Sequence, residues 1–476
     1  MIQAMLQRLA RFLDRPFFPW KHFVVGFSLA EFALENWLLF RQYRVLQRTT
    51  VPKALNKEID QETFDKSQKY GRAKAKFSFI SGIYNQIKHI ATIYFNLYPF
   101  VWSVAGSVIA RYAPMRFSGE ITQSLLFMYM LGWIDLVLGL GLSYYHTFVL
   151  EEKFGFNKST VQLWITDMVK GQALAIVFGI PIGSAFLSII KRTGQNFFYY
   201  LWVFMLVVQI SAMTIYPIII VPLFNKLEPL KPGKLKEDVE ALASKLEFPL
   251  SELQVIDGSK RSAHSNAYFT GLPWIGKKKI VIYDTLLEKS NEKEVEAVLA
   301  HELGHWQMNH TSRLLFIGQA HLFYMFALFS VFVNNRSLYA DFGFHREQPT
   351  IVGFMLFNEI LSPTDSILKL LMNMWTRKME YEAGMSYVLS YYRVHFPQLT
   401  SHRCLRREAR IHKRAWLLAT KAPNPELVEH GCRLAVLELP PLAPNLDGAL
   451  EGYELGWREE GGGGEGCGRG EAYQGF

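Results

Sequence analysis

The sequence contains little cysteine, three residues among 476, all in the last quarter of the chain. Cys404, Cys432 and Cys467 lack the paired spacing of a zinc knuckle and form no disulfide framework. The chain has no internal repeat, and its net charge of +9 is not arranged as a basic stripe with interleaved aromatic residues, so nucleic acid is not an expected partner. Residues 1–22 form a basic amphipathic segment without the features of a cleavable signal peptide, so we expect the apolar run that starts at Phe23 to remain as an anchor.

Apolar residues are abundant and fall into long runs. The chain is 50% hydrophobic and 14% aromatic, and its mean hydropathy of +0.07 is above what a soluble enzyme needs. Each run is near or above the ~20 residues of a membrane helix. The seven runs span residues 23–40, 89–110, 122–150, 172–190, 197–223, 313–334 and 349–373. The sequence therefore predicts a mainly α-helical, polytopic membrane protein with seven transmembrane helices.

Acidic residues lie inside several of these runs: Glu31, Glu35, Asp135, Glu359 and Asp365. A carboxylate that faces lipid is costly, so we expect each to face a wet interior or a partner side chain. Intramembrane acids also suit a transporter or channel, which would use Glu35, Asp135 and Glu359.

Loop charges predict an orientation. The 41–88 loop carries eleven Lys and Arg residues, whereas 111–120 carries only Arg111 and Arg116. By the positive-inside rule, 41–88, 151–171, 224–312 and the chain after 374 are cytosolic. The N-terminus is then lumenal, although four basic residues there oppose that placement: Arg8, Arg11, Arg15 and Lys21.

Segment 224–312 is predicted to be a small α+β domain between five membrane helices (1–223) and two more (313–373). Leu235, Val239, Leu242 and Leu246 recur on one face of a helix over 234–248. Residues 253–259 and 278–287 have the pattern of strands, and 292–310 that of a helix with acidic residues in its first turn. A helix over 374–392 follows the last span, and 393–476 is a low-complexity tail that is not expected to pack.

The helix over 292–310 contains the sequence His-Glu-Leu-Gly-His. Positions i and i+4 share a helix face, so His301 and His305 can bind one zinc ion, with Glu302 beside them to take a proton from a bound water molecule. The alternative is a chance pentapeptide on a packed helix. Small Ala300 and Gly304 favour the metal interpretation, because they allow close packing or ligand approach.

A hydrolytic zinc site needs a third protein ligand and one open position. Glu380 is the better candidate, because two membrane spans separate it from His305 and return the chain to the same side. Glu382 is its competitor, although two residues further along a helix it would point elsewhere. His310 is expected to be turned off the zinc-binding face.

Several segments together resemble a known family, the CAAX prenyl protease 1 or a-factor-converting enzymes, which are integral-membrane zinc metalloproteases. The resemblance covers most of residues 22–390. It rests on the order and spacing of 60–79, 148–160, 226–250, 258–272, 278–288, 294–310 and RKMEYEAG at 377–384.

The resemblance implies seven helices around a large water-filled chamber, with a gluzincin-like zinc site at its edge. It implies removal of the last three residues after a prenylated cysteine, with a second upstream cut in some substrates. The implied substrates are prenylated (farnesylated) C-termini of the lamin-precursor or mating-factor type. The implied location is the endoplasmic reticulum and inner nuclear membrane, with the active site on the cytosolic or nucleoplasmic side. His301, His305 and Glu380 match the ligands of one Zn²⁺, and Glu302 matches the general base.

The segment 264–269 matches the edge strand that holds an extended peptide in this family. Asn266 is expected to make a polar contact and Ala267 to permit close approach, with a weaker case for His264. An ordinary turn before a strand is the alternative.

The chain departs from the family pattern in two places. Gly384 replaces an aspartate expected to bond a zinc histidine, a loss that typically costs about 10–100-fold in metal affinity or activity. After about residue 392 the family's Asn-containing helix and His-Pro…Arg segment have no match, and His412 and Arg414 lie in a different context. A catalytically impaired relative that still binds lipidated tails is therefore the alternative function.

Overall fold

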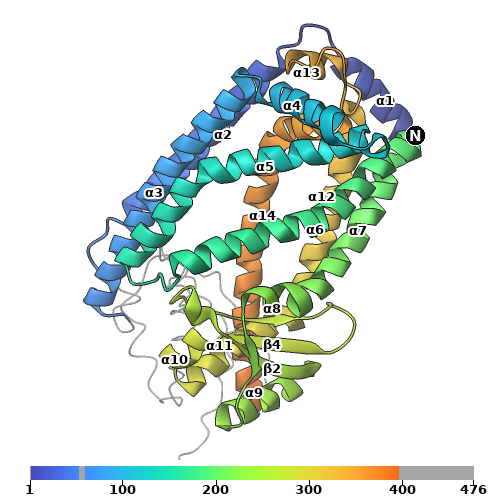
Figure 1. Cartoon of the computed structure of the whole chain (residues 1–476). Helices are drawn as coiled ribbons and strands as arrows, with labels where there is room; N and C mark the ends of the chain where they lie inside the picture. The colour runs from blue at the N-terminus through green and yellow to red at the C-terminus, as the bar shows by residue number, and fades with distance from the viewer. Residues whose placement is uncertain (1, 53–58, 396–476) are drawn as a thin grey trace, which may run out of the picture. The chain divides into compact units, whose positions relative to one another are not determined.

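The computed structural model describes residues 2–52 and 59–395 of a mostly helical chain (Figure 1). The predicted tail from 396 onward, with all three cysteines, His412 and Arg414, lies outside the described residues. The long helices are α1 (Ile2–Leu13), α2 (Trp20–Val45), α3 (Gln61–Tyr94), α4 (Leu97–Tyr112), α5 (Glu120–Tyr145), α6 (Val161–Thr193), α7 (Phe197–Ile215), α12 (His310–Phe332) and α14 (Thr350–His395).

Helices long and apolar enough to cross a membrane confirm the predicted class. The described residues contain five such helical runs, or six if the bent pair α3 and α4 counts as one span. The predicted spans 172–190 and 197–223 lie within one 64-residue run, Val161–Phe224. This run turns at the short helix η4 (Gly194–Asn196), and α6 and α7 pack against each other along it. The count of seven stays a prediction, because length and composition do not separate these two segments.

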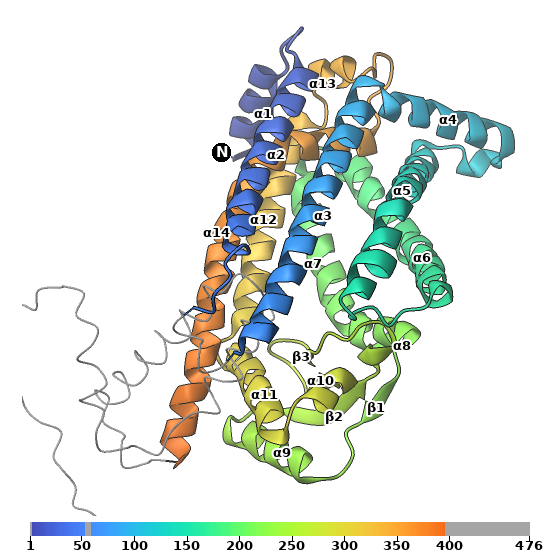
Figure 2. The ribbon, with the colours of Figure 1, turned by 90° about the vertical axis from the view of Figure 1, so that its left-hand side faces the viewer.

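The bend between α3 and α4 has a local cause. Asn96 adopts a left-handed backbone conformation with φ of 53°, which asparagine tolerates better than most residues, and the two helix axes differ by 65°. Lys21 donates a 2.6 Å hydrogen bond to its side-chain oxygen. Figure 2 shows α4 crossing one end of the helical region as a result.

The acids inside the membrane helices have partners, as expected from the cost of exposing them to lipid. Glu359 lies 2.8 Å from His89, and Asp135 lies 2.5 Å from Lys88. Glu31 accepts a 2.6 Å hydrogen bond from Ser362. Asp365 lies 3.1 Å from His321, and Glu35 lies 3.8 Å from Lys369.

The segment after α7 and the short helix α8 (Val221–Phe224) folds into a four-stranded sheet with helices. Its elements are β1 (Leu227–Pro229), α9 (Lys234–Lys245), β2 (Leu250–Ile256), β3 (Ala267–Thr270), β4 (Lys278–Tyr283), α10 (Asp284–Lys289) and α11 (Glu292–Gln307). The strand order is β1-β2-β4-β3, with β2 and β4 parallel and the other pairs antiparallel. Because β3 is at the edge, only its β4 side is paired within the sheet.

The predicted strand 253–259 overlaps β2, and the edge strand expected from the family resemblance at 264–269 overlaps β3. The predicted strand 278–287 covers β4, but its end from Asp284 is wrong, because those residues begin α10. Only β1 among these strands was not expected from the sequence. Val239 of α9 packs with Leu253, Ile280 and Leu299 in one buried cluster. This cluster holds α9 and α11 against the sheet, and it confirms the predicted apolar face of the 234–248 helix.

The last described helix differs from expectation. The sequence suggested a membrane span to 373 and a separate helix from 374, but α14 runs unbroken for 46 residues. The residues after 373 are polar but contain no glycine or proline before Gly384, so nothing there interrupts the helical hydrogen bonds. Glu380 is therefore rigidly connected to the membrane part of the chain.

Candidate metal centre

The helix that carries His301 and His305 has a strong start signal. Asn291 caps α11, accepting from the backbone N–H of Glu294 at 3.0 Å, while the Glu294 carboxylate accepts from the Asn291 N–H at 3.0 Å. Leu299 and Leu303 are fully buried on the side of α11 that faces the sheet. This packing turns the two histidines toward α14.

Close contact between α11 and α14 depends on a glycine. A Cβ atom placed on Gly304 would lie 2.7 Å from the backbone oxygen of Ala383, which is too short for any side chain. Ala383 is itself fully buried. The small residue noted in the sequence therefore lets the two helices approach.

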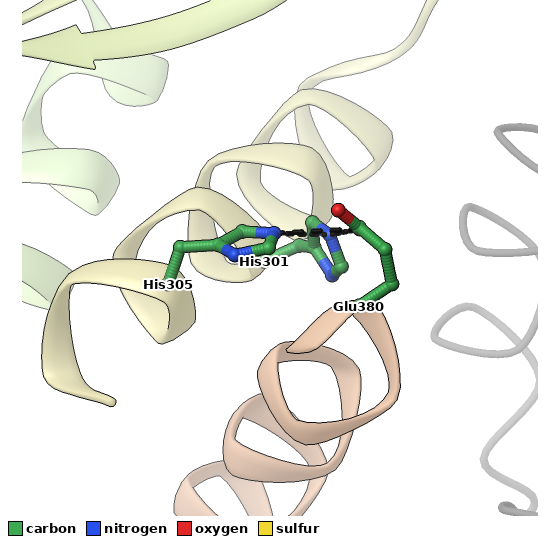
Figure 3. A group of neighbouring side chains, drawn as sticks. All are labelled: His301, His305 and Glu380. Atoms are coloured by element: carbon green, nitrogen blue, oxygen red, sulfur yellow. Dashed lines mark hydrogen bonds and ion pairs between the residues drawn. The ribbon is translucent and has the colours of Figure 1, made fainter. Parts of the chain in front are cut away.

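At this crossing the side chains of His301, His305 and Glu380 converge (Figure 3). A Glu380 carboxylate oxygen lies 3.1 Å from Nε2 of His301 and 3.4 Å from Nε2 of His305. The two Nε2 atoms are 3.2 Å apart, and all three ligand atoms lie within 4.8 Å of one another. The structure thus unites three of the predicted site residues from two helices.

This donor set fits a metal ion. Two imidazole nitrogens and one carboxylate oxygen are the ligands of many catalytic zinc sites, which keep a fourth position open for water or substrate. The acid also acts on the imidazoles electrostatically. Burial opposes the charged form of His305, but the hydrogen bond and charge of Glu380 outweigh it and raise the pKa of His305 above its usual value.

A second group of side chains contacts His305 at Nδ1, the ring nitrogen that does not face Glu380. Its Nδ1 atom lies 2.9 Å from Nδ1 of His310, which is buried, and Nε2 of His310 lies 3.2 Å from the Glu382 carboxylate. Arg313 contacts the same carboxylate at 3.3 Å. If Nε2 of His305 faces a metal ion, its Nδ1 carries the proton, which is donated to His310, and His310 in turn donates to Glu382.

Sequence reasoning missed this relay of His305, His310 and Glu382. His310 does point away from the three ligand atoms, but the turn at Asn309, with φ of 56°, brings its ring against His305. Glu382 points away from them too and serves His310 instead. The spacing of five residues after His305, together with a carboxylate two residues after Glu380, was the available signal.

Gly384 lies on the far side of His301. A Cβ atom added there would be 3.9 Å from Nδ1 of His301, and among the described residues no other atom outside its own stretch of helix lies within 4 Å. The position is therefore the one from which an aspartate side chain would reach this ring.

A cavity of about 760 Å³ opens beside the cluster. Glu302, His305 and Glu380 line one side, and Asn266 and Ala267 line another with the rest of β3. Tyr268 also borders it, and burial raises the pKa of this phenol to about 12, so that it stays a neutral hydrogen-bond donor. Catalytic and peptide-binding candidates thus share one cavity.

His264 does not line this cavity. Its ring stacks on Phe156 with centroids 4.4 Å apart, and its Nε2 lies 3.5 Å from Glu151. The structure places it where it ties the segment before β3 to the helical segment η3 (His146–Glu151) and to the loop that follows it.

Further contacts fasten this segment, and none was foreseen from the sequence. Arg261 makes two hydrogen bonds to Asp167 of α6, at 2.8 and 3.0 Å, and one of 2.7 Å to the backbone oxygen of Phe224. Asn157 and Ser262 form an isolated β-bridge. The start of the edge strand is therefore anchored to the membrane helices.

The sequence and architecture of this chain match those of known proteins. The family profile "CAAX prenyl protease N-terminal, five membrane helices" matches residues 42–226, and "Peptidase family M48" matches 229–388. CAAX prenyl protease 1 of Saccharomyces cerevisiae is 46% identical over 391 residues, covering 79% of this chain and 86% of the relative. The chain belongs to the CAAX prenyl protease 1 family.

Other members agree with this assignment. The human CAAX prenyl protease 1 homolog is 38% identical over 399 residues, covering 76% of this chain and 83% of the relative. The crystal structure of S. mikatae Ste24p superposes with a TM-score of 0.76 at 41% identity, covering 89% of this chain and all of that one. Membership in this family supports the assignment of the chain as a multi-pass membrane metalloprotease. It also supports prenylated proteins as its substrates and a metal ion as its cofactor.

Proposed function

We propose that this chain is a zinc-dependent endopeptidase that removes the C-terminal tripeptide of prenylated CAAX proteins, in some substrates with a second upstream cut. His301, His305 and Glu380 hold one Zn²⁺. The observation that carries the proposal is the convergence of three ligand atoms within 4.8 Å at the wall of a cavity large enough for several peptide residues.

The residues around the ion have separate tasks. Bound zinc would polarise a water molecule and the scissile carbonyl. Glu302 lines the same cavity and takes the proton from that water, then delivers it to the leaving amine. The relay through His310 and Glu382 keeps Nε2 of His305 unprotonated and directed at the ion.

The edge strand holds the peptide. The open side of β3 can pair with an extended substrate by main-chain hydrogen bonds, which tolerate different side chains. Asn266 adds a polar contact, and the small Ala267 leaves room for the peptide. Met213 and Tyr216 also line this cavity. Both lie within the apolar helical run Val161–Phe224, so a prenyl group can remain in apolar surroundings while its peptide reaches the zinc.

The remaining parts of the proposal concern the membrane. We infer seven transmembrane helices around a water-filled chamber, a gluzincin-like arrangement at its edge, and residence in the endoplasmic reticulum and inner nuclear membranes with the site toward the cytosol or nucleoplasm. Lamin-precursor and mating-factor type proteins represent the substrate class. The basic 41–88 and 224–312 segments support this orientation.

One observation favours a second candidate, a relative that binds lipidated tails but cleaves them inefficiently. Gly384 leaves Nδ1 of His301 without the carboxylate that the family places there. Reduced metal affinity would follow from that loss.

Metal analysis and peptide turnover test both candidates and the transporter alternative. We expect about one zinc per chain, lost in His301→Ala, and turnover of a farnesylated CAAX peptide that stops in Glu302→Gln while zinc is retained. Glu296→Gln, a change elsewhere on α11, is the matched control. Bound zinc without peptide turnover would indicate the catalytically impaired relative. Peptidase activity that survives a strong chelator would refute the zinc mechanism. Absence of bound zinc would favour the transporter alternative.

A further inference from the structure

Among the described residues, helix α1 is held in place by one face. Leu6 is buried and packs with Ala10 and Leu13 against the main apolar core. Gln3 and Gln7 both donate to the side-chain oxygen of Gln195, at 3.1 and 2.6 Å. These contacts fix the rotation of α1 about its axis, so the direction of its other faces is defined.

The outward face of α1 is apolar. Met5, Leu9 and Phe12 follow the i, i+4, i+7 spacing of one helix stripe, and Met5 and Phe12 are 63% and 60% exposed. Phe17, just beyond the helix, is fully exposed. Exposed apolar patches of this kind mark sites of protein or membrane contact.

Arginines flank this stripe. Arg8, Arg11 and Arg15 are exposed, and the guanidinium of Arg15 lies 4.4 Å from the centre of the Phe12 ring. Within residues 2–52 and 59–395, no carboxylate forms an ion pair with any of the three. They therefore present uncompensated positive charge beside apolar side chains.

The turn between α4 and α5 repeats the arrangement. Arg111 lies over Tyr112 and Arg116 over Phe117, at 5.4 and 4.8 Å from the ring centres, and Met115 is 94% exposed. Figures 1 and 2 both place α1 and α4 at the end of the helical region away from the sheet. Two segments far apart in sequence thus expose the same chemistry at one end.

We propose that α1 and the η2 turn (Met115–Phe117) each bind an anionic phospholipid bilayer at this end of the helical region, with the apolar side chains in the acyl boundary and the arginines on headgroup phosphates. Residues 14–19 alone separate α1 from the membrane helix α2, so α1 is confined to the membrane boundary. Guanidinium groups bind phosphate oxygens with charge-assisted hydrogen bonds. The basic N-terminal residues, which oppose the loop-charge orientation, then have a role at the lipid surface.

Depth-resolved quenching tests the apolar contact. The full chain with Cys404, Cys432 and Cys467 replaced by serine carries Phe12→Cys, and this new cysteine is labelled with bimane. The labelled protein is reconstituted in phosphatidylcholine/phosphatidylglycerol nanodiscs that contain brominated acyl chains. We expect quenching several-fold stronger than at Glu237→Cys, an exposed position on α9. Equal quenching at the two positions, or quenching at position 12 by aqueous iodide alone, would overturn the proposal.

A lipid titration tests the arginines. The concentration of phosphatidylglycerol, added as mixed micelles, that half-maximally raises the melting temperature of the protein in detergent is the measured quantity. It is expected to increase about fivefold per arginine removed in Arg8→Gln, Arg11→Gln and Arg15→Gln. The control replaces Lys234, Lys236 and Lys245 of α9 with glutamine and should leave that concentration unchanged. Equal effects of the two sets would refute headgroup recognition. So would a wild-type dimer in detergent that Met5→Ser with Phe12→Ser dissociates, because a second copy would then cover the stripe.

Discussion

Replacing Gly384 with aspartate is expected to strengthen zinc binding. The added Cβ would lie 3.9 Å from Nδ1 of His301, on the side of the ring opposite to the Nε2 atom that faces Glu380. The carboxyl carbon extends about 1.5 Å further, which brings an oxygen within hydrogen-bond distance of Nδ1. Because no other atom outside the local helix lies within 4 Å of that Cβ in the part of the chain that the structure describes, the substitution displaces none of these residues.

The magnitude follows from the role of such a carboxylate. Carboxylates that accept from a metal-bound histidine typically contribute 10–100-fold in metal affinity, or about 1.4 to 2.7 kcal/mol. The new bond acts on His301, whereas the existing relay acts on His305, so the two effects are expected to be close to additive. Aspartate also replaces glycine within α14, which adds a few tenths of a kcal/mol of helix stability at most.

Chelator competition on the purified full chain measures the change in zinc affinity. Gly384→Ala controls for helix propensity and volume, and Gly384→Asn supplies a side chain of similar shape without the charge. We expect the order Asp, then Asn, then Ala, with Ala close to the wild type. Equal zinc affinity of the Asp and Ala variants would refute the reasoning. A parallel rise in turnover of a farnesylated peptide would show that this position limits the activity of the wild-type chain.

Three further changes probe the packing and the relay. Glu382→Gln is expected to weaken zinc binding about tenfold, because His310 loses its anionic acceptor. His310→Ala in the same background should weaken zinc binding little further, and fully additive effects of the two substitutions would contradict a relay. Gly304→Ala should cost roughly 1–3 kcal/mol in the free energy of unfolding and also weaken zinc binding, since its Cβ would meet backbone of α14; an unchanged melting temperature would exclude the tight crossing. Arg261→Met and Asp167→Leu, made singly and together, should show a coupling energy of about 1 kcal/mol or more in unfolding, and amide exchange in β3 should rise in each single variant.

The family was accessible from the order and spacing of motifs along most of the chain. The helical membrane class and the pairing of His301 with His305 were also accessible, because each rests on a short-range regularity. Apolar runs of membrane length determine where helices cross a bilayer, and an i, i+4 spacing places two rings on one helix face whatever the rest of the fold does. The capping residues of α11 follow the same local rules.

The relay and the anchored edge strand depended on contacts between segments far apart in the chain. His310 meets Glu382 across 72 positions, and Arg261 meets Asp167 across 94, distances over which no periodic pattern carries information. The short strand β1 was missed for a related reason, since three residues become a strand only when a neighbour supplies the hydrogen bonds. Local residue patterns therefore specified which side chains could hold a metal ion, while packing of α11 on α14 decided which ones meet and what supports them.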